Sequence, residues 1–211
     1  MKNLPVAKYA ALGFVLSMIS FALLDERVYY LTRVTDPDAI AIWKRITFLG
    51  DSSWMAVVTI LMMLAGFGMA RLKPENTGWR TTGRKGVYIF ASVFASGAFI
   101  MVIKGLVGRA RPYLFETEGP RGFDPLSFAS EYASWPSGHT TTAFAMAAAV
   151  ALVYPKTRYI GFALAILAGY SRMPLEAHYL ADVIIGATIG TLGAIAMYRL
   201  LAGRLGLAPR E

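Results

Sequence analysis

The chain contains only two histidines, and each lies in a short polar segment beside a long apolar stretch. His139 ends the run Pro-Ser-Gly-His at 136–139, and His178 is followed four residues later by Asp182. An imidazole can attack phosphorus as a nucleophile or exchange a proton with a reacting oxygen. Two imidazoles and a carboxylate, each next to an apolar segment, therefore predict a site for group transfer or hydrolysis.

The spacing of His178 and Asp182 assigns each a role. Four residues apart, they would share one face of a helix. The Asp182 carboxylate would then accept one ring N–H of His178, which fixes the tautomer and leaves the other ring nitrogen free. It would also stabilise the positive charge that develops on the attacking imidazole. We predict that His178 is the nucleophile; the alternative is a purely structural hydrogen-bonded pair.

The segment that precedes His139 is suited to binding an anion. A helix that begins near residue 138 presents free backbone N–H groups and the positive end of its dipole. Gly138 lets a phosphate approach the backbone closely, and Ser137 adds a hydroxyl donor. His139 would then serve as the general acid that protonates the departing oxygen.

Three basic residues complete the predicted site. Lys104 and Arg111 are seven residues apart, which is about two helical turns, and Arg172 precedes His178 by six residues. Arginine binds phosphate oxygens in a bidentate manner, whereas lysine acts as a point charge. We predict that all three bind the phosphate. For Arg109 and Arg121 the favoured interpretation is instead that the side chains reach lipid headgroups.

The residue types also exclude some chemistry. The chain has no cysteine, so it forms no cysteinyl phosphate. No cluster of Asp and Glu suggests a metal-dependent phosphatase. We therefore predict a reaction without metal or cofactor, in which fixed cations stabilise the charge on the phosphoryl oxygens.

The composition indicates that these residues are held by a membrane protein. Hydrophobic residues make up 56% of the 211 positions, the mean hydropathy is +0.49, and 16% of residues are charged, against roughly 25% in soluble domains. A helical span needs about 20 apolar residues. We predict one all-α domain, 1–211, with six spans in a bundle, at about 6–24, 52–70, 86–103, 138–154, 159–171 and 180–201.

The distribution of charge predicts an orientation. Cytoplasmic segments are enriched in Lys and Arg. If the N-terminus is inside, twelve of the 21 basic residues fall on the inner side: Lys2, Lys8, Arg71, Lys73, Arg80, Arg84, Lys85, Lys156, Arg158, Arg199, Arg204 and Arg210. Only Glu75 and Glu211 join them among the acids. Both termini are then cytoplasmic, the site faces the periplasm or exterior, and the net charge of +8 does not indicate a nucleic-acid partner.

Two further segments carry structural predictions. Asp36 and Pro37 begin a helix whose apolar residues share one side, so the segment 37–49 reads as an interfacial helix. It is either a tether between spans or a lipid-facing wall of the site. Gly186 and Gly190 have the spacing that allows close helix packing, which we expect within the bundle and not in a dimer.

The three polar segments resemble the three signatures of the type 2 phosphatidic acid phosphatase (PAP2) superfamily. The matches are Lys104-x6-Arg111-Pro112, then 136–139, then Ser171-Arg172-x5-His178-x3-Asp182. The resemblance implies a six-span all-α bundle with an extracytoplasmic site and no metal. It also implies that His178 forms a phosphohistidine oriented by Asp182. His139 would protonate the leaving group and then activate water. The implied phosphate-binding residues are Lys104, Arg111, Arg172, Ser137 and Gly138.

Together these features predict a lipid phosphatase of the bacterial inner membrane. Bacterial members similar to this chain act on undecaprenyl diphosphate, phosphatidylglycerophosphate, phosphatidic acid or lipid A phosphates, and undecaprenyl diphosphate is favoured here. One alternative is a lipid phosphotransferase with the same site. A more remote one is a transporter of anionic lipids. The hydropathy argues against the vanadium haloperoxidases, which share the anion site but are soluble. The oligomeric state is open.

Overall fold

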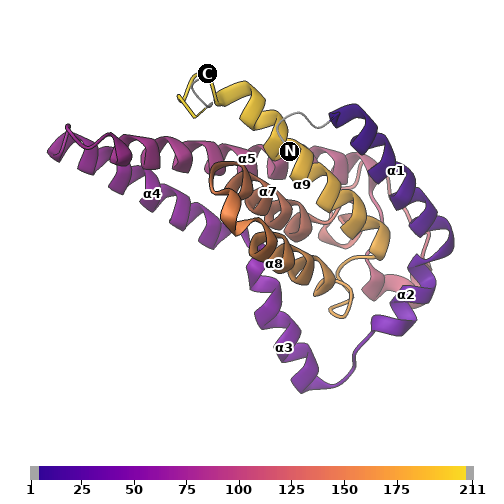
Figure 1. Cartoon of the computed structure of the whole chain (residues 1–211). Coiled ribbons are helices and arrows are strands. Elements are labelled where there is room, and N and C mark those ends of the chain that lie inside the picture. Colours follow the sequence, from indigo (N-terminus) through magenta and orange to yellow (C-terminus); the bar gives the residue numbers. More distant parts are fainter. Residues whose placement is uncertain (1–4, 208–211) are drawn as a thin grey trace.

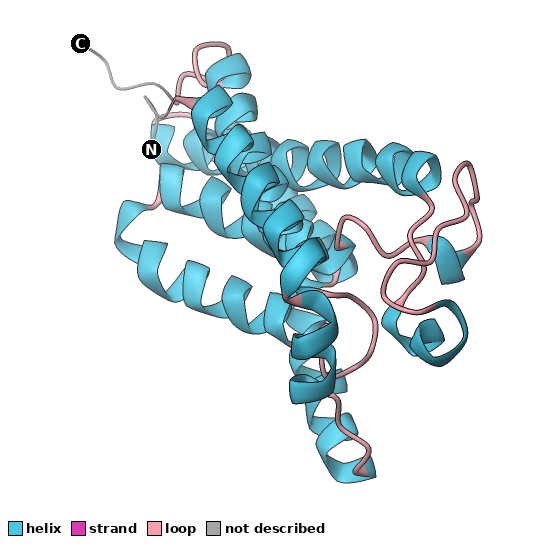
Figure 2. Cartoon of the chain, turned by 90° about the vertical axis from the view of Figure 1, so that its right-hand side faces the viewer, coloured by secondary structure: helices cyan, strands magenta, loops and turns pink. Residues whose placement is uncertain are grey.

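The computed structural model describes residues 5–207, and these residues form helices and loops without a β-strand (Figure 2). Lys2, Arg210 and Glu211, which entered the charge count above, lie outside this range. The α-helices are α1 (Val6–Leu23), α2 (Asp25–Thr32), α3 (Pro37–Thr47), α4 (Ser52–Leu72), α5 (Thr77–Val107), α6 (Phe115–Glu118), α7 (Gly138–Val153), α8 (Arg158–Tyr170) and α9 (Leu180–Leu201).

Each of the six predicted spans coincides with a helix, namely α1, α4, α5, α7, α8 and α9. By length and apolarity, four stretches of the described chain are candidates to cross a membrane: Val6–Leu23, Pro37–Leu72, Thr77–Val107 and Leu180–Leu201. The other two helices are shorter than a span of about 20 residues, since α7 has 16 residues and α8 has 13. The all-helical fold is therefore confirmed, while the count of six spans stays a prediction.

Helix α7 lies at the centre of the bundle. It packs against α5, α8 and α9, whereas α4 runs along α5 and α1 runs along α9 (Figure 1). Most of its buried side chains are alanine or threonine. Because these side chains are small, three helices can approach α7 at once.

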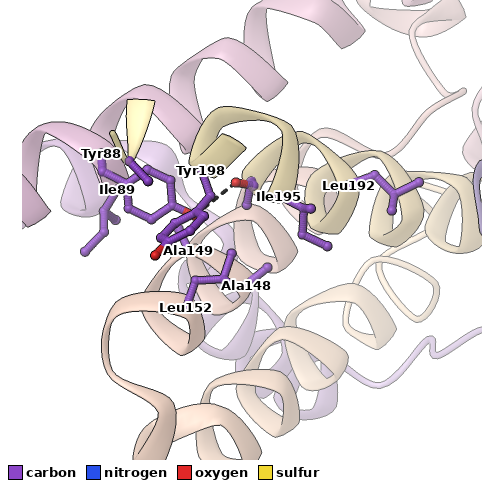
Figure 3. Close-up of a cluster of buried hydrophobic side chains, with 10 residues drawn as sticks. Tyr88, Ile89, Ala148, Ala149, Leu152, Leu192, Ile195 and Tyr198 are labelled. Carbon is purple, nitrogen blue, oxygen red and sulfur yellow. Dashed lines mark hydrogen bonds between the residues drawn. The ribbon is translucent and has the colours of Figure 1, made fainter. Parts of the chain in front are cut away.

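The largest apolar cluster joins α5, α7 and α9 (Figure 3). The Tyr88 hydroxyl donates to the carbonyl oxygen of Ala194 at 2.9 Å, and the Tyr88 and Tyr198 rings meet edge to face. Ala148 and Ala149 of α7 are fully buried between these partners. A buried tyrosine whose hydroxyl has a partner fixes the packing of α5 on α9 without leaving an unpaired polar atom.

The two glycines of α9 pack against α7, as the sequence predicted. A side chain at Gly190 would collide with the Thr141 carbonyl oxygen, and a Cβ at Gly186 would lie 2.8 Å from the Ser137 carbonyl oxygen. The spacing therefore serves contact within the bundle, where the α9 backbone meets the start of α7.

Helix α3 has the predicted beginning. The Asp36 carboxylate accepts the Ala39 N–H at 2.8 Å, and Pro37 is the first helical residue. Its Trp43 ring lies 5.3 Å from the Tyr170 ring of α8, measured between centroids, while Ile42 is 55% exposed. One part of the apolar face thus packs on the bundle and another part stays exposed. Its location at a membrane interface stays a prediction.

We expect Gly190→Ala to destabilise the protein. The new methyl group would press on the Thr141 carbonyl, and overpacking of this kind costs about 1–3 kcal/mol. Thermal unfolding of purified protein in detergent measures the effect. The matched control is Gly68→Ala in α4, where an added Cβ meets nothing within 4 Å, so its midpoint should not fall. Equal midpoints for both variants would contradict the close contact of α9 with α7.

Candidate active site

The predicted site residues gather where several helices begin or end. Lys104 lies in the last turn of α5, and His139 is the second residue of α7. His178 precedes α9, in which Asp182 is the third residue. The end of α5 and the starts of α7 and α9 lie at the same end of the bundle, next to the loops that connect them (Figure 1).

Asp182 is the most fully bonded of these residues. Its side chain is 0% exposed, and Oδ2 accepts the Ser134 hydroxyl at 2.6 Å and the backbone N–H of Tyr179 at 2.8 Å. Oδ1 accepts Nη1 of Arg109 at 2.7 Å. Because three donors from separate segments meet on one carboxylate, its position is fixed from three sides.

The pairing of His178 with Asp182 is confirmed as proximity, but its predicted helical geometry is wrong. His178 lies before Tyr179, the N-cap of α9, and is not on the helix. The helix begins later because the Asp182 carboxylate caps the Tyr179 N–H. The distance from Nδ1 of His178 to Oδ2 of Asp182 is 3.6 Å, which is too long for a hydrogen bond. The role of Asp182 in fixing the tautomer therefore stays a prediction.

The surroundings of His178 favour the neutral imidazole. Its side chain is 3% exposed, and its backbone N–H donates to the Arg172 carbonyl oxygen at 3.2 Å. Burial lowers the pKa of His178 well below its usual value, although the nearby Asp182 carboxylate opposes this shift. At neutral pH the ring is therefore unprotonated, as a nucleophile must be.

Helix α7 begins where the sequence predicted, but its use as an anion site stays a prediction, since the Ser137 side chain is buried and its hydroxyl accepts the Thr140 hydroxyl at 2.8 Å. Ser137 is the N-cap and Gly138 is the first helical residue. The Ser137 N–H donates to the Asp182 carbonyl oxygen at 3.0 Å, which ties the start of α7 to the start of α9. A Cβ at Gly138 would lie 3.8 Å from Cδ1 of Ile100 and 3.9 Å from Cε of Lys104. This side of the glycine therefore faces α5.

The three predicted phosphate-binding cations are oriented by backbone or hydroxyl acceptors. Lys104 Nζ donates to the Ala133 carbonyl oxygen, and Arg111 Nε donates to the Ser130 carbonyl oxygen at 2.8 Å. Arg172 Nη1 donates to the Thr47 hydroxyl, while its Nε is buried without a hydrogen-bond partner. The charges of all three residues act on one another and on His139.

Arg109 corrects the sequence interpretation. The predicted lipid-facing arginine is 1% exposed, because Nη1 pairs with Asp182 and Nη2 pairs with Asp25 at 2.8 Å. Its guanidinium also lies over the rings of Phe21 and Tyr179. Asp25 was missed as well, although an acidic residue directly after an apolar span signals a buried partner. Arg121, in contrast, is exposed.

A cleft of about 690 Å³ lies between the beginning of α4, the second half of α5 and the start of α7. Apolar side chains of α5 line one side of it: Val93, Phe94, Ile100 and Met101. Polar residues also border it, namely Asp51, Ser52, Ser53, Lys104, His139 and Thr142. Two residues before α4, a Cβ on Gly50 would lie 2.8 Å from the His139 carbonyl oxygen, and the Thr142 hydroxyl donates to the Gly50 carbonyl oxygen at 2.6 Å.

This arrangement provides the elements of phosphoryl transfer. A neutral imidazole lies beside a buried carboxylate, a second imidazole starts a helix, and three cations surround them. Phosphoryl transfer depends mainly on such positioning and charge stabilisation. Within residues 5–207, no three His, Cys, Asp or Glu side chains are grouped as metal ligands would be.

Comparisons with known proteins agree with this arrangement. The Lipid A 1-phosphatases of Rhizobium etli and Rhizobium johnstonii are each 36% identical over 148 residues, which is 69% of this chain and 64% and 61% of theirs. A Lipid A 1-phosphatase of Porphyromonas gingivalis is 28% identical over 153 residues, 71% of this chain and 32% of its own. The chain thus covers less than two thirds of the length of these relatives.

A solved structure shows the same fold. The crystal structure of a transmembrane PAP2 type phosphatidylglycerolphosphate phosphatase from Bacillus subtilis has a TM-score of 0.63 at 23% identity, covering 95% of this chain and 98% of that one. The model of the PAP2 superfamily matches residues 85–205, which include all three polar segments of the site. The chain belongs to the PAP2 superfamily.

Proposed function

We propose that this protein hydrolyses a phosphate ester of a membrane lipid through a phosphohistidine at His178. The observation that carries the proposal is the pairing of His178 with the buried, triply bonded Asp182, beside His139 and three cations, in a chain of the PAP2 superfamily. Buried Nε of Arg172, which has no partner in the protein, is a donor suited to a phosphate oxygen.

In the first step, Nε2 of His178 attacks phosphorus and the bond from phosphorus to the lipid oxygen breaks. His139 gives a proton to that oxygen, so the lipid leaves as an alcohol, or as a monophosphate if the substrate is a diphosphate. Lys104, Arg111 and Arg172 stabilise the charge on the remaining phosphoryl oxygens, and the backbone N–H of Gly138 adds a donor at the start of α7. Asp182 stabilises the phosphorylated imidazole.

In the second step, water releases the phosphate. His139, now unprotonated, takes a proton from the water as its oxygen attacks phosphorus. The nitrogen–phosphorus bond breaks and His178 regains its lone pair. Inorganic phosphate is released and both imidazoles return to their starting state, so no redox partner or cofactor enters the balance.

The cleft between α4 and α5 favours a lipid as substrate. Apolar side chains of α5 line one side of it up to Lys104 and His139. A lipid whose phosphate is bound at the site would therefore have its hydrocarbon chain beside apolar side chains. Lipid A 1-phosphate is the first candidate, because three relatives carry that name. Those names shift the preference away from undecaprenyl diphosphate. Phosphatidylglycerophosphate and phosphatidic acid come next.

The location follows from the same proposal. We place the protein in a bacterial inner membrane with both termini in the cytoplasm and the site facing the periplasm or exterior. The excess of basic residues in the segments 71–85 and 154–158 supports this orientation. The α4–α5 and α7–α8 connections are then cytoplasmic, and the ends that carry the site lie on the opposite side.

The test is phosphate release by purified full-length protein in detergent with EDTA, on lipid A, phosphatidylglycerophosphate, phosphatidic acid and undecaprenyl diphosphate. We expect wild-type protein to release phosphate from at least one of them. His178→Ala should release none, because the nucleophile is gone. His139→Ala keeps the nucleophile and should be slower by about 10²- to 10⁴-fold, the usual contribution of a general acid or base.

Trapping the intermediate separates the two histidines. With a substrate labelled at the phosphate, wild type and His139→Ala should form an acid-labile, base-stable phosphoprotein, and His178→Ala should not. Label on His178→Ala, or equal turnover by that variant, would contradict the mechanism. Product formed only when a lipid or sugar alcohol is added would identify a phosphotransferase. Lipid movement without phosphate release would identify a transporter.

Gly138→Ala tests whether the backbone at the start of α7 contacts the phosphate. The methyl group would make only ordinary contacts, at 3.8 Å from Ile100 and 3.9 Å from Lys104, so the fold should be unaffected. It would nevertheless occupy space between the backbone and Lys104. We expect a lower kcat/KM and an unchanged thermal midpoint. The control is Gly161→Ala in α8, where a Cβ has similar contacts at 3.7 Å but lies away from the site. Full activity of Gly138→Ala would rule out close phosphate approach here.

A further inference from the structure

Three charged side chains are buried together behind the nucleophile. Asp25, Arg109 and Asp182 are each 1% exposed or less. They come from the start of α2, the loop after α5 and the start of α9. Burying charges is costly unless each is paired and hydrogen-bonded. The hydrogen-bond partners of these three side chains therefore identify the segments that the cluster joins.

Arg109 connects the two carboxylates. Nη1 donates to Asp182 Oδ1 at 2.7 Å and Nη2 donates to Asp25 Oδ2 at 2.8 Å. Nη2 also donates to the Pro120 carbonyl oxygen at 3.1 Å. The two amino groups of one planar guanidinium have a fixed spacing, so the position of Asp25 determines where Arg109 places Asp182.

Asp25 is itself fixed by the helices on either side. Its Oδ1 accepts the backbone N–H of Ala181 at 2.9 Å and the Ser20 hydroxyl at 2.9 Å. The neighbouring Ser17 hydroxyl donates to the Ala181 carbonyl oxygen at 2.9 Å. The two backbone groups of Ala181, directly before Asp182, are thus bonded to α2 through Asp25 and to α1 through Ser17.

The cluster would also contribute to the charge behind His178. Burial raises the pKa of Asp25, and the Arg109 guanidinium opposes this shift. With both carboxylates ionised, the two carboxylates and one guanidinium carry one net negative charge, which would stabilise the positive ring formed during phosphoryl transfer. Without Asp25 the remaining pair would be neutral. The charged groups facing His178 itself are Asp182 of α9, Lys104 of α5 and Arg172 of its own loop.

We propose that Asp25 and Arg109 are positioning residues for the phosphohistidine chemistry, and that α1 and α2 thereby complete the active site. This rests on the proposed role of His178. Asp25 lies outside residues 85–205, the region that matches the family model, so the chain supplies part of the support for its nucleophile from its N-terminal helices. The competing explanation is that the cluster only holds α1 to the bundle.

Asp25→Asn separates the two explanations. Asparagine has the same shape and keeps an oxygen for the Ala181 N–H and the Ser20 hydroxyl, but it cannot pair with Arg109 as an anion. If Asp25 is a positioning residue, the kcat of Asp25→Asn should fall by up to roughly 100-fold while its KM is unchanged. The acid limb of the kcat/KM profile should move to lower pH, because the protonated imidazole loses a nearby negative charge. The substrate is whichever of the four lipids wild-type protein hydrolyses.

Two further variants serve as controls. Glu26→Gln makes the same charge change at the adjacent exposed position and should leave kcat and the pH profile as in wild type. Arg109→Lys keeps the charge but cannot reach both carboxylates in fixed geometry. It should lower kcat and leave the acid limb in place. It also keeps the proposal testable if Asp25→Asn does not fold.

A measurement without turnover tests the same idea. The chain has two histidines, so ¹⁵N labelling of histidine gives two imidazoles to follow by NMR, and the His139→Ala protein identifies the signals of His178. Titration should show a lower pKa for His178 in Asp25→Asn than in wild type or Glu26→Gln. If wild type hydrolyses none of the lipids, the proposed function fails, and this titration still decides whether Asp25 acts on His178.

The outcomes are distinct. If the cluster is purely structural, Asp25→Asn should have a lower thermal midpoint and a smaller folded fraction. In the folded part of that protein, the His178 titration and the acid limb of the kcat/KM profile should be unchanged. That result would overturn the proposal, as would wild-type kcat for Arg109→Lys. A fall in kcat together with the shifted titration would establish the positioning role.

Discussion

The site depends on one buried carboxylate. Asp182 holds the Tyr179 N–H, the Ser134 hydroxyl and the Arg109 guanidinium, and each of these bonds fixes a different segment of the chain. Its backbone carbonyl also accepts the Ser137 N–H and so ties α7 to α9. Because a charged group that loses a partner in the interior is strongly destabilised, the loop after α5, the segment before α7 and the start of α9 have to come together. The bonds of Asp182 therefore contribute both to the stability of the fold and to the geometry of the candidate active site.

Small residues allow the helix ends at the site to approach one another closely. The starts of α7 and α9 approach closely because Gly186 and Gly190 face the first turns of α7. The alanines of α7 then allow α5 and α8 to pack on its other sides. Larger side chains at these positions would separate the helix ends, and the Asp182 bonds would lengthen beyond hydrogen-bonding distance.

Much of the site could be predicted from the sequence because its signals are local. Each signal is contained in a short stretch of sequence: the glycine after Ser137, the spacing of Lys104 and Arg111, and the polar segment around each histidine. The helices could be predicted from hydropathy. Arg109 and Asp25 could not be found in this way. Their partners are 73 and 84 residues apart along the chain, and the same basic residue next to an apolar span equally fits a headgroup contact. The helical placement of His178 was wrong because capping by Asp182 takes precedence over the periodicity of four.

The close approach of Gly50 to α7 joins one wall of the cleft to the helix that carries His139. Gly50, two residues before α4, lies against the His139 backbone, and the Thr142 hydroxyl donates to the Gly50 carbonyl oxygen. Under the proposed function, a hydrocarbon chain seated in that cleft would lie against the same segment that contacts the His139 backbone. A shift of the beginning of α4 would then change the space for the lipid and the position of α7 together.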